Sequence, residues 1–114
     1  MADTIFGKIV RREIPADIVY EDDDVLAFRD LNPQAPVHVL FVPKHAIATL
    51  NDAGPADAEL LGKLLLAAAS YAKQHGFEKD GYRTVINCNE HGGQTVFHLH
   101  VHLLAGRRMT WPPG

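Results

Sequence analysis

The chain has 114 residues, of which 46% are hydrophobic and 22% charged, and its net charge is −3 with histidine neutral. These values are typical of one globular domain that buries a core without disulfides. They exclude a nucleic-acid binder with a basic stripe, since arginines cluster only in the pairs Arg11-Arg12 and Arg107-Arg108.

Two further classes are excluded by the cysteine count and by the apolar runs. The single cysteine, Cys88, permits neither an internal disulfide nor a cysteine-based zinc site. The first twenty residues lack the basic and apolar regions of a secretory signal, and the longest apolar run, 64–69, is too short to cross a bilayer. We therefore expect a cytoplasmic protein that does not contact a membrane.

The N-terminal third predicts one short helix and two strands. Residues 4–13 are expected to be helical, because Asp3 or Thr4 can cap the helix and Ile5 and Ile9 share a face; Pro15 stops it. Strands are expected at 18–20 and 25–29, joined by an acidic turn at 21–24.

The rest of the chain predicts three more strands and one long helix. After a proline-containing loop, residues 37–42 are rich in β-branched and aromatic side chains. Leucines and alanines at spacings of three and four predict a helix from Pro55, with Gly76 closing it. Strands are expected at 82–87 and 97–104, with a glycine-rich loop before the last. The fold class is therefore α+β: about five strands, mostly antiparallel, with one long and one short helix.

Three histidines at alternate positions are the main candidates for chemistry. His98, His100 and His102 would project from one face of a strand, whereas Leu99, Val101 and Leu103 would project from the other. Because the second set is apolar, it should pack on the core. The histidine face should then be exposed or line a cleft.

Three interpretations of this face remain open on the residues alone. The histidines could be a coincidence, although crowding three imidazoles invites repulsion once any is protonated. They could hold a metal with a third ligand from His38 or Asp30, although no HExxH motif or cysteine pair supports one. They could also act in catalysis, because a neutral imidazole can attack while a protonated neighbour stabilises negative charge. Gly92-Gly93 and Thr95, directly upstream, favour catalysis, since a glycine-flanked hydroxyl suits a phosphate.

The stretch "HLHVHLL" at 98–104 resembles the signature of the histidine-triad family, in which three histidines alternate with apolar residues. The resemblance extends over nearly the whole chain, and the closing "WPPG" is similar to the Hint branch, the histidine-triad nucleotide-binding proteins. It implies a single domain over 1–114. It also implies a phosphoramidase that hydrolyses purine nucleoside 5′-phosphoramidates, or aminoacyl adenylates, through a covalent nucleotidyl-histidine intermediate.

The resemblance also implies a role for each site residue. His100 would be the nucleophile, His102 would contact the phosphate, and His98 and His38 would hold His100 in place. Thr95 stands where the branch usually has serine and would bind the phosphate or the leaving group. Asp30 would bind the ribose. The predicted nucleotide-binding set is Ile5, Phe6, Ile9, Ile14, Phe28, Arg29, Asp30, Leu31, Asn87, Gly93, Gln94, Thr95, His100, His102 and Trp111.

Members of this branch need no metal or other cofactor, so none is expected here. They are homodimers built through the long helix and a strand, and the tail containing Trp111 lies near the partner's site. Three positions depart from the pattern: Arg29 replaces a common histidine, His45-Ala46 shifts another histidine by one place, and Cys88 occupies a variable position.

Two other functions remain possible at the level of sequence. A nucleotide-binding regulatory or scaffold protein would hydrolyse only incidentally, but binding alone needs no nucleophile. A dinucleoside polyphosphate hydrolase of the same superfamily would keep all three histidines, but the "DTIFGKI" start and the "WPPG" end are unlike that branch.

Overall fold

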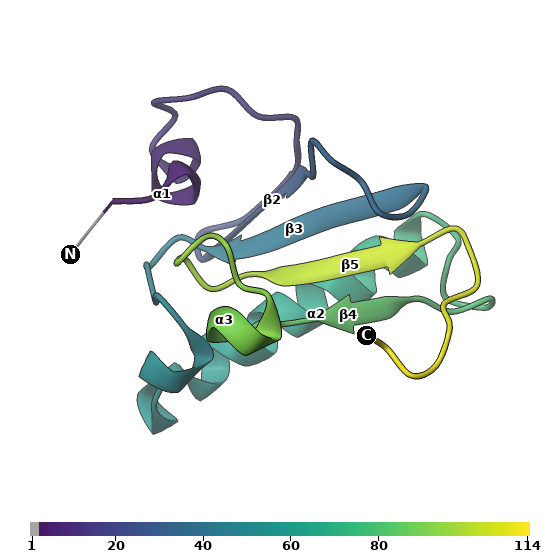
Figure 1. Cartoon of the computed structure of the whole chain (residues 1–114). Coiled ribbons are helices and arrows are strands. Elements are labelled where there is room, and N and C mark those ends of the chain that lie inside the picture. Colours follow the sequence, from purple (N-terminus) through teal and green to yellow (C-terminus); the bar gives the residue numbers. More distant parts are fainter. Residues whose placement is uncertain (1–2) are drawn as a thin grey trace.

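A five-stranded sheet forms the centre of the computed structural model, which describes residues 3–114 (Figure 1). The strand order is β1-β2-β3-β5-β4, and every neighbouring pair is antiparallel. The strands are β1 (Ile18–Glu21), β2 (Val25–Arg29), β3 (Val37–Pro43), β4 (Arg83–Val85) and β5 (Val101–Ala105). This arrangement confirms the predicted α+β class and its mostly antiparallel sheet.

The long helix α2 (Ala58–Gln74) covers one face of the sheet, behind the strands in Figure 1. A 3-10 turn, η2 (Pro55–Asp57), leads into it, so the predicted start at Pro55 is confirmed as the start of a helical segment. Leu64, Ala68 and Tyr71 of α2 are buried against Val39 and Phe41 of β3. This apolar layer is the main core and fixes the back of the sheet.

The short helix α1 (Ile5–Val10) lies on the opposite face. Thr4 caps it, because its side-chain oxygen accepts a hydrogen bond of 3.1 Å from the backbone N–H of Gly7. Phe6 packs against Phe28 with ring centroids 5.2 Å apart. The helix is shorter than the predicted range 4–13 and ends at Val10, because Arg12 adopts a positive φ of 63° that a helix cannot contain.

Side-chain alternation assigns each strand residue to one of these two layers. In β2, Val25 and Ala27 belong to the α2 layer, whereas Leu26 and Phe28 belong to the α1 layer. The turn after β1 also forms as predicted, since one carboxylate oxygen of Asp22 accepts from the backbone N–H groups of Asp24 and Val25, both at 2.8 Å.

Three predictions in the C-terminal half need correction. The last strand begins at Val101 and not at Phe97, so His98 and His100 precede it. The ladder with β3 ends at the pair of Phe41 and Val101, and the backbone N–H of Leu99 donates to Ile47 at 2.6 Å instead. The expected loop at 89–95 contains a short helix, α3 (Asn89–Gly92), and a 3-10 turn, η1 (Leu50–Asp52), precedes η2. The strand expected at 82–87 is only Arg83–Val85.

No helix within residues 3–114 combines the length and the apolar character that crossing a bilayer requires.

Candidate functional site

A cavity of about 430 Å³ opens on the α1 face of the sheet, between α1, the end of β2 and the histidines. It brings together most of the residues predicted to form the site. The predicted residues that line it are Ile5, Phe6, Ile9, Ile14, Phe28, Arg29, Asp30, Leu31, Thr95, His100 and His102. These residues come from segments far apart in the sequence, and the fold brings α1, the end of β2 and two of the histidines around the same cavity.

Sequence reasoning did not predict five further lining residues: Pro15, Ala16, Asp17, Leu40 and Val96. Strand pairing is the signal that could have identified Leu40, because Leu40 lies opposite His102 in the ladder of β3 and β5. Asp17 forms an ion pair of 2.8 Å with Arg29 at the cavity wall. Both side chains are largely exposed, so this pair belongs to the rim.

His100 is buried to 7% exposure at the floor of the cavity. Its Nδ1 lies 2.8 Å from the carbonyl oxygen of His98, which can only accept a hydrogen bond. Nδ1 therefore carries the proton in neutral His100, and Nε2 carries the lone pair. The ring of Phe6 packs edge-on against the imidazole at 5.0 Å between centroids. The result is an imidazole fixed in one tautomer and one orientation.

His102 is held by His38 from the neighbouring strand. Nε2 of His38 lies 2.9 Å from Nδ1 of His102. The resemblance implied that His38 holds His100, but in the structure His38 contacts His102 instead. The reason is the strand register: His38 pairs with Leu104 and so lies diagonally to His102 on the same face. The backbone N–H of Gln34 donates to Nδ1 of His38 at 3.0 Å.

These contacts determine where the protons lie. Because Nδ1 of His38 accepts from Gln34, the proton of neutral His38 is on Nε2, and it points at Nδ1 of His102. Nδ1 of His102 then accepts, and its proton is on Nε2. This Nε2 is buried and has no hydrogen-bond partner within residues 3–114. A buried donor without a partner is costly, which indicates that a ligand atom completes the site.

Burial keeps the clustered histidines neutral. Together with proximity to His100 and His38, it lowers the pKa of His102 to about 4. Burial also lowers the pKa values of His100, His98 and His38, opposed for His38 by the carboxylate of Asp30. At neutral pH the cavity therefore presents imidazole lone pairs and N–H donors without net charge.

His98 does not line the cavity. Its Nε2 lies 2.7 Å from the carbonyl oxygen of Pro43, to which it can only donate, and the residue is 2% exposed. This hydrogen bond fastens the segment before β5 to the end of β3. His98 thus supports the position of His100 through its own backbone carbonyl.

The predicted loop residues Asn87, Gly93 and Gln94 do not line the cavity. The side chain of Gln94 accepts from the backbone N–H of Asn89 at 2.9 Å and donates to the carbonyl of Ala48 at 2.8 Å. Gly93 closes α3 with a φ of 84°, a conformation that favours glycine. These contacts make Gln94 a support of the loop that carries Thr95, and a direct role in ligand binding stays a prediction.

Asp30 stands between the cavity and His38. One of its carboxylate oxygens accepts from the backbone N–H of Asn32 at 2.8 Å, and the other lies 3.5 Å from Nε2 of His38. Donor atoms of Asp30, His38 and His102 all lie within 4.8 Å of one another. Two imidazoles and a carboxylate suit zinc, but binding would require the hydrogen bond between His38 and His102 to break.

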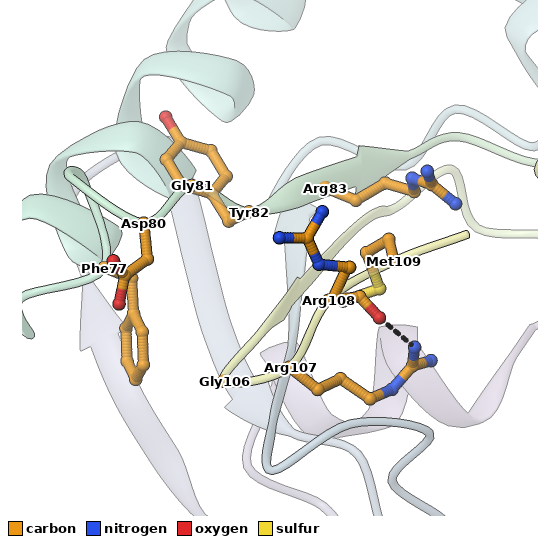
Figure 2. A pocket seen from close by; sticks show the side chains of 9 residues that line it. All are labelled: Phe77, Asp80, Gly81, Tyr82, Arg83, Gly106, Arg107, Arg108 and Met109. Atoms are coloured by element: carbon orange, nitrogen blue, oxygen red, sulfur yellow. Dashed lines mark hydrogen bonds between the residues drawn. The ribbon is translucent and has the colours of Figure 1, made fainter. Parts of the chain in front are cut away.

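Trp111 lies away from this cavity and is 81% exposed. The guanidinium of Arg83 sits 5.9 Å from the centroid of its ring. A second cavity, of about 690 Å³, adjoins this tail and is lined by Tyr82, Arg83 and the segment 106–109 among others (Figure 2). The predicted contact of Trp111 with a nucleotide stays a prediction.

Comparison with known proteins gives matches that extend over most of this chain. The HIT domain pattern matches residues 11–109. The chain is 54% identical over 105 residues to the purine nucleoside phosphoramidase of Escherichia coli, covering 92% of this chain and 88% of that protein. It is 56% identical over 113 residues to the 14 kDa zinc-binding protein of Zea mays, covering 97% of this chain and 88% of that protein. A crystal structure of a HIT family hydrolase from Legionella pneumophila superposes on this chain with a TM-score of 0.96 at 53% identity. The match covers 98% of this chain and 100% of that chain.

Proposed function

Because the chain belongs to the HIT domain family, we propose that it hydrolyses purine nucleoside 5′-phosphoramidates, and aminoacyl adenylates, to the nucleoside monophosphate. The observation that carries this proposal is the pairing of two imidazoles with opposite proton positions. His100 offers a lone pair on Nε2, and neighbouring His102 offers a proton on Nε2, at one cavity. A nucleophile beside a donor is what displacement at phosphorus needs.

The cavity has two ends that suit the two ends of a nucleotide. Apolar side chains of α1 and β2, among them Phe6, Ile9 and Phe28, form one end and can enclose a flat purine base. Asp30 also lines the cavity, and its carboxylate can accept hydrogen bonds from both ribose hydroxyls. The histidines and Thr95 form the other end, for the phosphate.

The first step forms a bond between Nε2 of His100 and phosphorus and breaks the bond between phosphorus and nitrogen. The departing amine keeps the bonding electron pair and takes up one proton from solvent, and the proton released in the second step replaces it. His102 and Thr95 donate hydrogen bonds to the phosphate oxygens as negative charge develops on them. The proton remains on Nδ1 of His100 and stays hydrogen-bonded to the carbonyl oxygen of His98. This hydrogen bond stabilises the positive charge that nucleotidyl transfer places on the imidazole ring.

In the second step water attacks phosphorus, and the bond between phosphorus and Nε2 of His100 breaks. The electron pair returns to the imidazole, and one water proton is released to the site. The sum is phosphoramidate plus water giving monophosphate plus amine, so no redox partner is required. No metal takes part in either step.

The decisive experiment compares wild type with His100→Ala on adenosine 5′-phosphoramidate. We expect the variant to bind AMP with an affinity near that of wild type, measured by calorimetry, yet to lose hydrolysis by about a thousandfold or more, since the nucleophile is absent. Wild-type turnover should persist in excess chelator.

Equal rates for the two proteins would refute the role of His100. Loss of activity in chelator, restored by zinc, would instead assign the chemistry to a metal at Asp30, His38 and His102. Faster turnover of a dinucleoside polyphosphate than of the phosphoramidate would assign the chain to the alternative hydrolase activity.

We further propose that the active form is a homodimer and that it acts in the cytoplasm. The dimer is supported by the exposed edge strand β4 and by the exposed leucines of α2. The compartment stays an expectation from the sequence.

A further inference from the structure

We infer that Arg107, which does not line the histidine-containing cavity, is a positioning residue. It sets the proton positions of His38 and His102 through the loop of residues 30–36. This inference rests on the function proposed above. It starts from a chain of hydrogen bonds that runs from an exposed guanidinium to the buried histidine pair.

Arg107 holds the carbonyl oxygen of Gln34 with two donors. Its Nε lies 3.2 Å and its Nη2 lies 3.0 Å from that oxygen. The remaining Nη1 donates to the carbonyl of its own neighbour, Arg108, at 3.2 Å. A planar fork that contacts one acceptor through two nitrogens restricts its direction, which a single ammonium cannot do to the same degree.

The approach of this segment to the loop is fixed by Gly106. Its φ of 96° places it in the left-handed region, and a Cβ at this position would lie 2.8 Å from Cβ of Pro36. Glycine is therefore required where the chain leaves β5 and passes over the loop. This contact places Arg107 directly beside Gln34.

Gln34 connects the guanidinium to the histidines. Its backbone N–H donates to Nδ1 of His38, and His38 in turn lies 2.9 Å from His102. The N–H and the carbonyl of Gln34 flank the same Cα, so a fixed carbonyl limits the torsions that aim the N–H. Without this donor, His38 could carry its proton on Nδ1, and Nε2 would then accept from His102.

That change would reverse the function of His102. With its proton drawn to Nδ1, His102 would present a lone pair at Nε2, next to the phosphate oxygens. A lone pair facing an anionic oxygen is repulsive, whereas the N–H donates to it. The loop contact of Arg107 thus bears on whether His102 stabilises or opposes the transition state.

The adjacent Arg108 provides a matched control. It has the same charge and lies one position along the same exposed segment, but its side chain makes no hydrogen bond or ion pair within residues 3–114. Figure 2 shows the side chains of Arg107 and Arg108 pointing to opposite sides of this segment. A nonspecific effect of removing positive charge would affect both arginines alike.

The test combines turnover with nitrogen NMR of the wild-type, Arg107→Ala, Arg107→Lys and Arg108→Ala proteins. Protonated and unprotonated imidazole nitrogens resonate in separate ¹⁵N ranges, so the spectra report the tautomers of His38 and His102 directly. We expect Arg107→Ala to lower kcat on adenosine 5′-phosphoramidate by about tenfold with KM within about twofold, and to mix the tautomers of both histidines. Arg107→Lys should recover part of both effects, and Arg108→Ala should match wild type.

The inference is overturned if Arg107→Ala leaves the tautomers of His38 and His102 unchanged, whether or not kcat falls. It is also overturned if Arg108→Ala mixes the tautomers as strongly. Failure of the proposed function is recognised separately: wild type would then not turn over the phosphoramidate, while the NMR comparison would still decide the role of Arg107.

Discussion

The two histidines at the cavity differ in whether Nε2 carries a lone pair, as in His100, or a proton, as in His102, and that difference comes from backbone groups. A carbonyl fixes His100, because it can only accept a hydrogen bond, and an amide fixes His38, because it can only donate one. A side chain at either place could reverse its role by rotating or titrating. Backbone partners thus leave a lone pair on one imidazole and a proton on the other, at the same cavity.

This histidine cluster predicts how stability depends on pH. Burial lowers the pKa of His102 from 6.5 to about 4, and it also lowers the pKa values of His100, His98 and His38. The unfolded chain therefore binds more protons than the folded chain between pH 6.5 and about 4. The free energy of unfolding should be fully retained above pH 6.5 and should fall as pH drops through this window.

His102 alone accounts for a loss of about 3 kcal/mol across that window. Urea unfolding at a series of pH values measures it, and His102→Gln, which cannot titrate, should give a shallower dependence than wild type. A variant whose curve runs parallel to that of wild type would contradict the origin proposed for this loss.

Residues of the site were predictable from the sequence where local contacts position them, and unpredictable where distant contacts do. The alternation of His98, His100 and His102 with Leu99, Val101 and Leu103 predicted the buried apolar set correctly, since alternation needs only local backbone geometry. The partner of His38 could not be predicted, because it depends on the register of two strands more than sixty residues apart. The hydrogen bonds of Arg107 and Gln94 to backbone carbonyls leave no sequence pattern.

At the scale of elements, α2 stabilises the sheet by placing large side chains on its rear face. Leu64 is fully buried there, at 0% exposure, among Val39, Phe41 and Leu103. Leu64→Ala should lower the free energy of unfolding by about 3 kcal/mol, since it removes buried methyl groups and leaves a cavity. Chemical denaturation of the two proteins measures the difference.

Lys73→Ala on the exposed side of the same helix is the control, and it should change the free energy of unfolding by less than about 0.5 kcal/mol. Similar losses in both variants would contradict burial of Leu64 as the origin of the effect, because alanine is the best helix former and neither substitution lowers helix propensity.

The elements themselves were predictable where a period repeats and unpredictable where it does not. The last strand and the long helix were predicted because their apolar residues recur at spacings of two, three and four. The four-residue helix α3 is too short to show a period. The strand predicted to begin at Phe97 begins only at Val101. Its start is determined by hydrogen-bond pairing with β3, whereas the alternation of apolar residues extends to positions before the first pair.

At the scale of the whole molecule, two exposed features are candidates for an interface. β4 is an edge strand, paired only with β5, so its outer backbone groups have no strand partner within the described chain. Leu65 and Leu66 of α2 are 44% and 71% exposed, which is unusual for neighbouring leucines on a helix that packs on a core. We expect a second copy of the chain to cover these leucines and to pair with the strand edge.

This face predicts that Leu66→Asp converts a dimer into a monomer. Sedimentation at micromolar concentration should show wild type with twice the mass of the variant, because a carboxylate would be desolvated in the apolar centre of the interface. Leu31→Asp is the control: Leu31 is 96% exposed but lies at the rim of the cavity, so the substitution should leave the dimer intact. A wild-type protein that sediments as a monomer, or a Leu66→Asp variant that stays dimeric, would show that these leucines do not form the interface. If the dimer dissociates and hydrolysis falls with it, the second copy completes the site, as expected for the tail that carries Trp111.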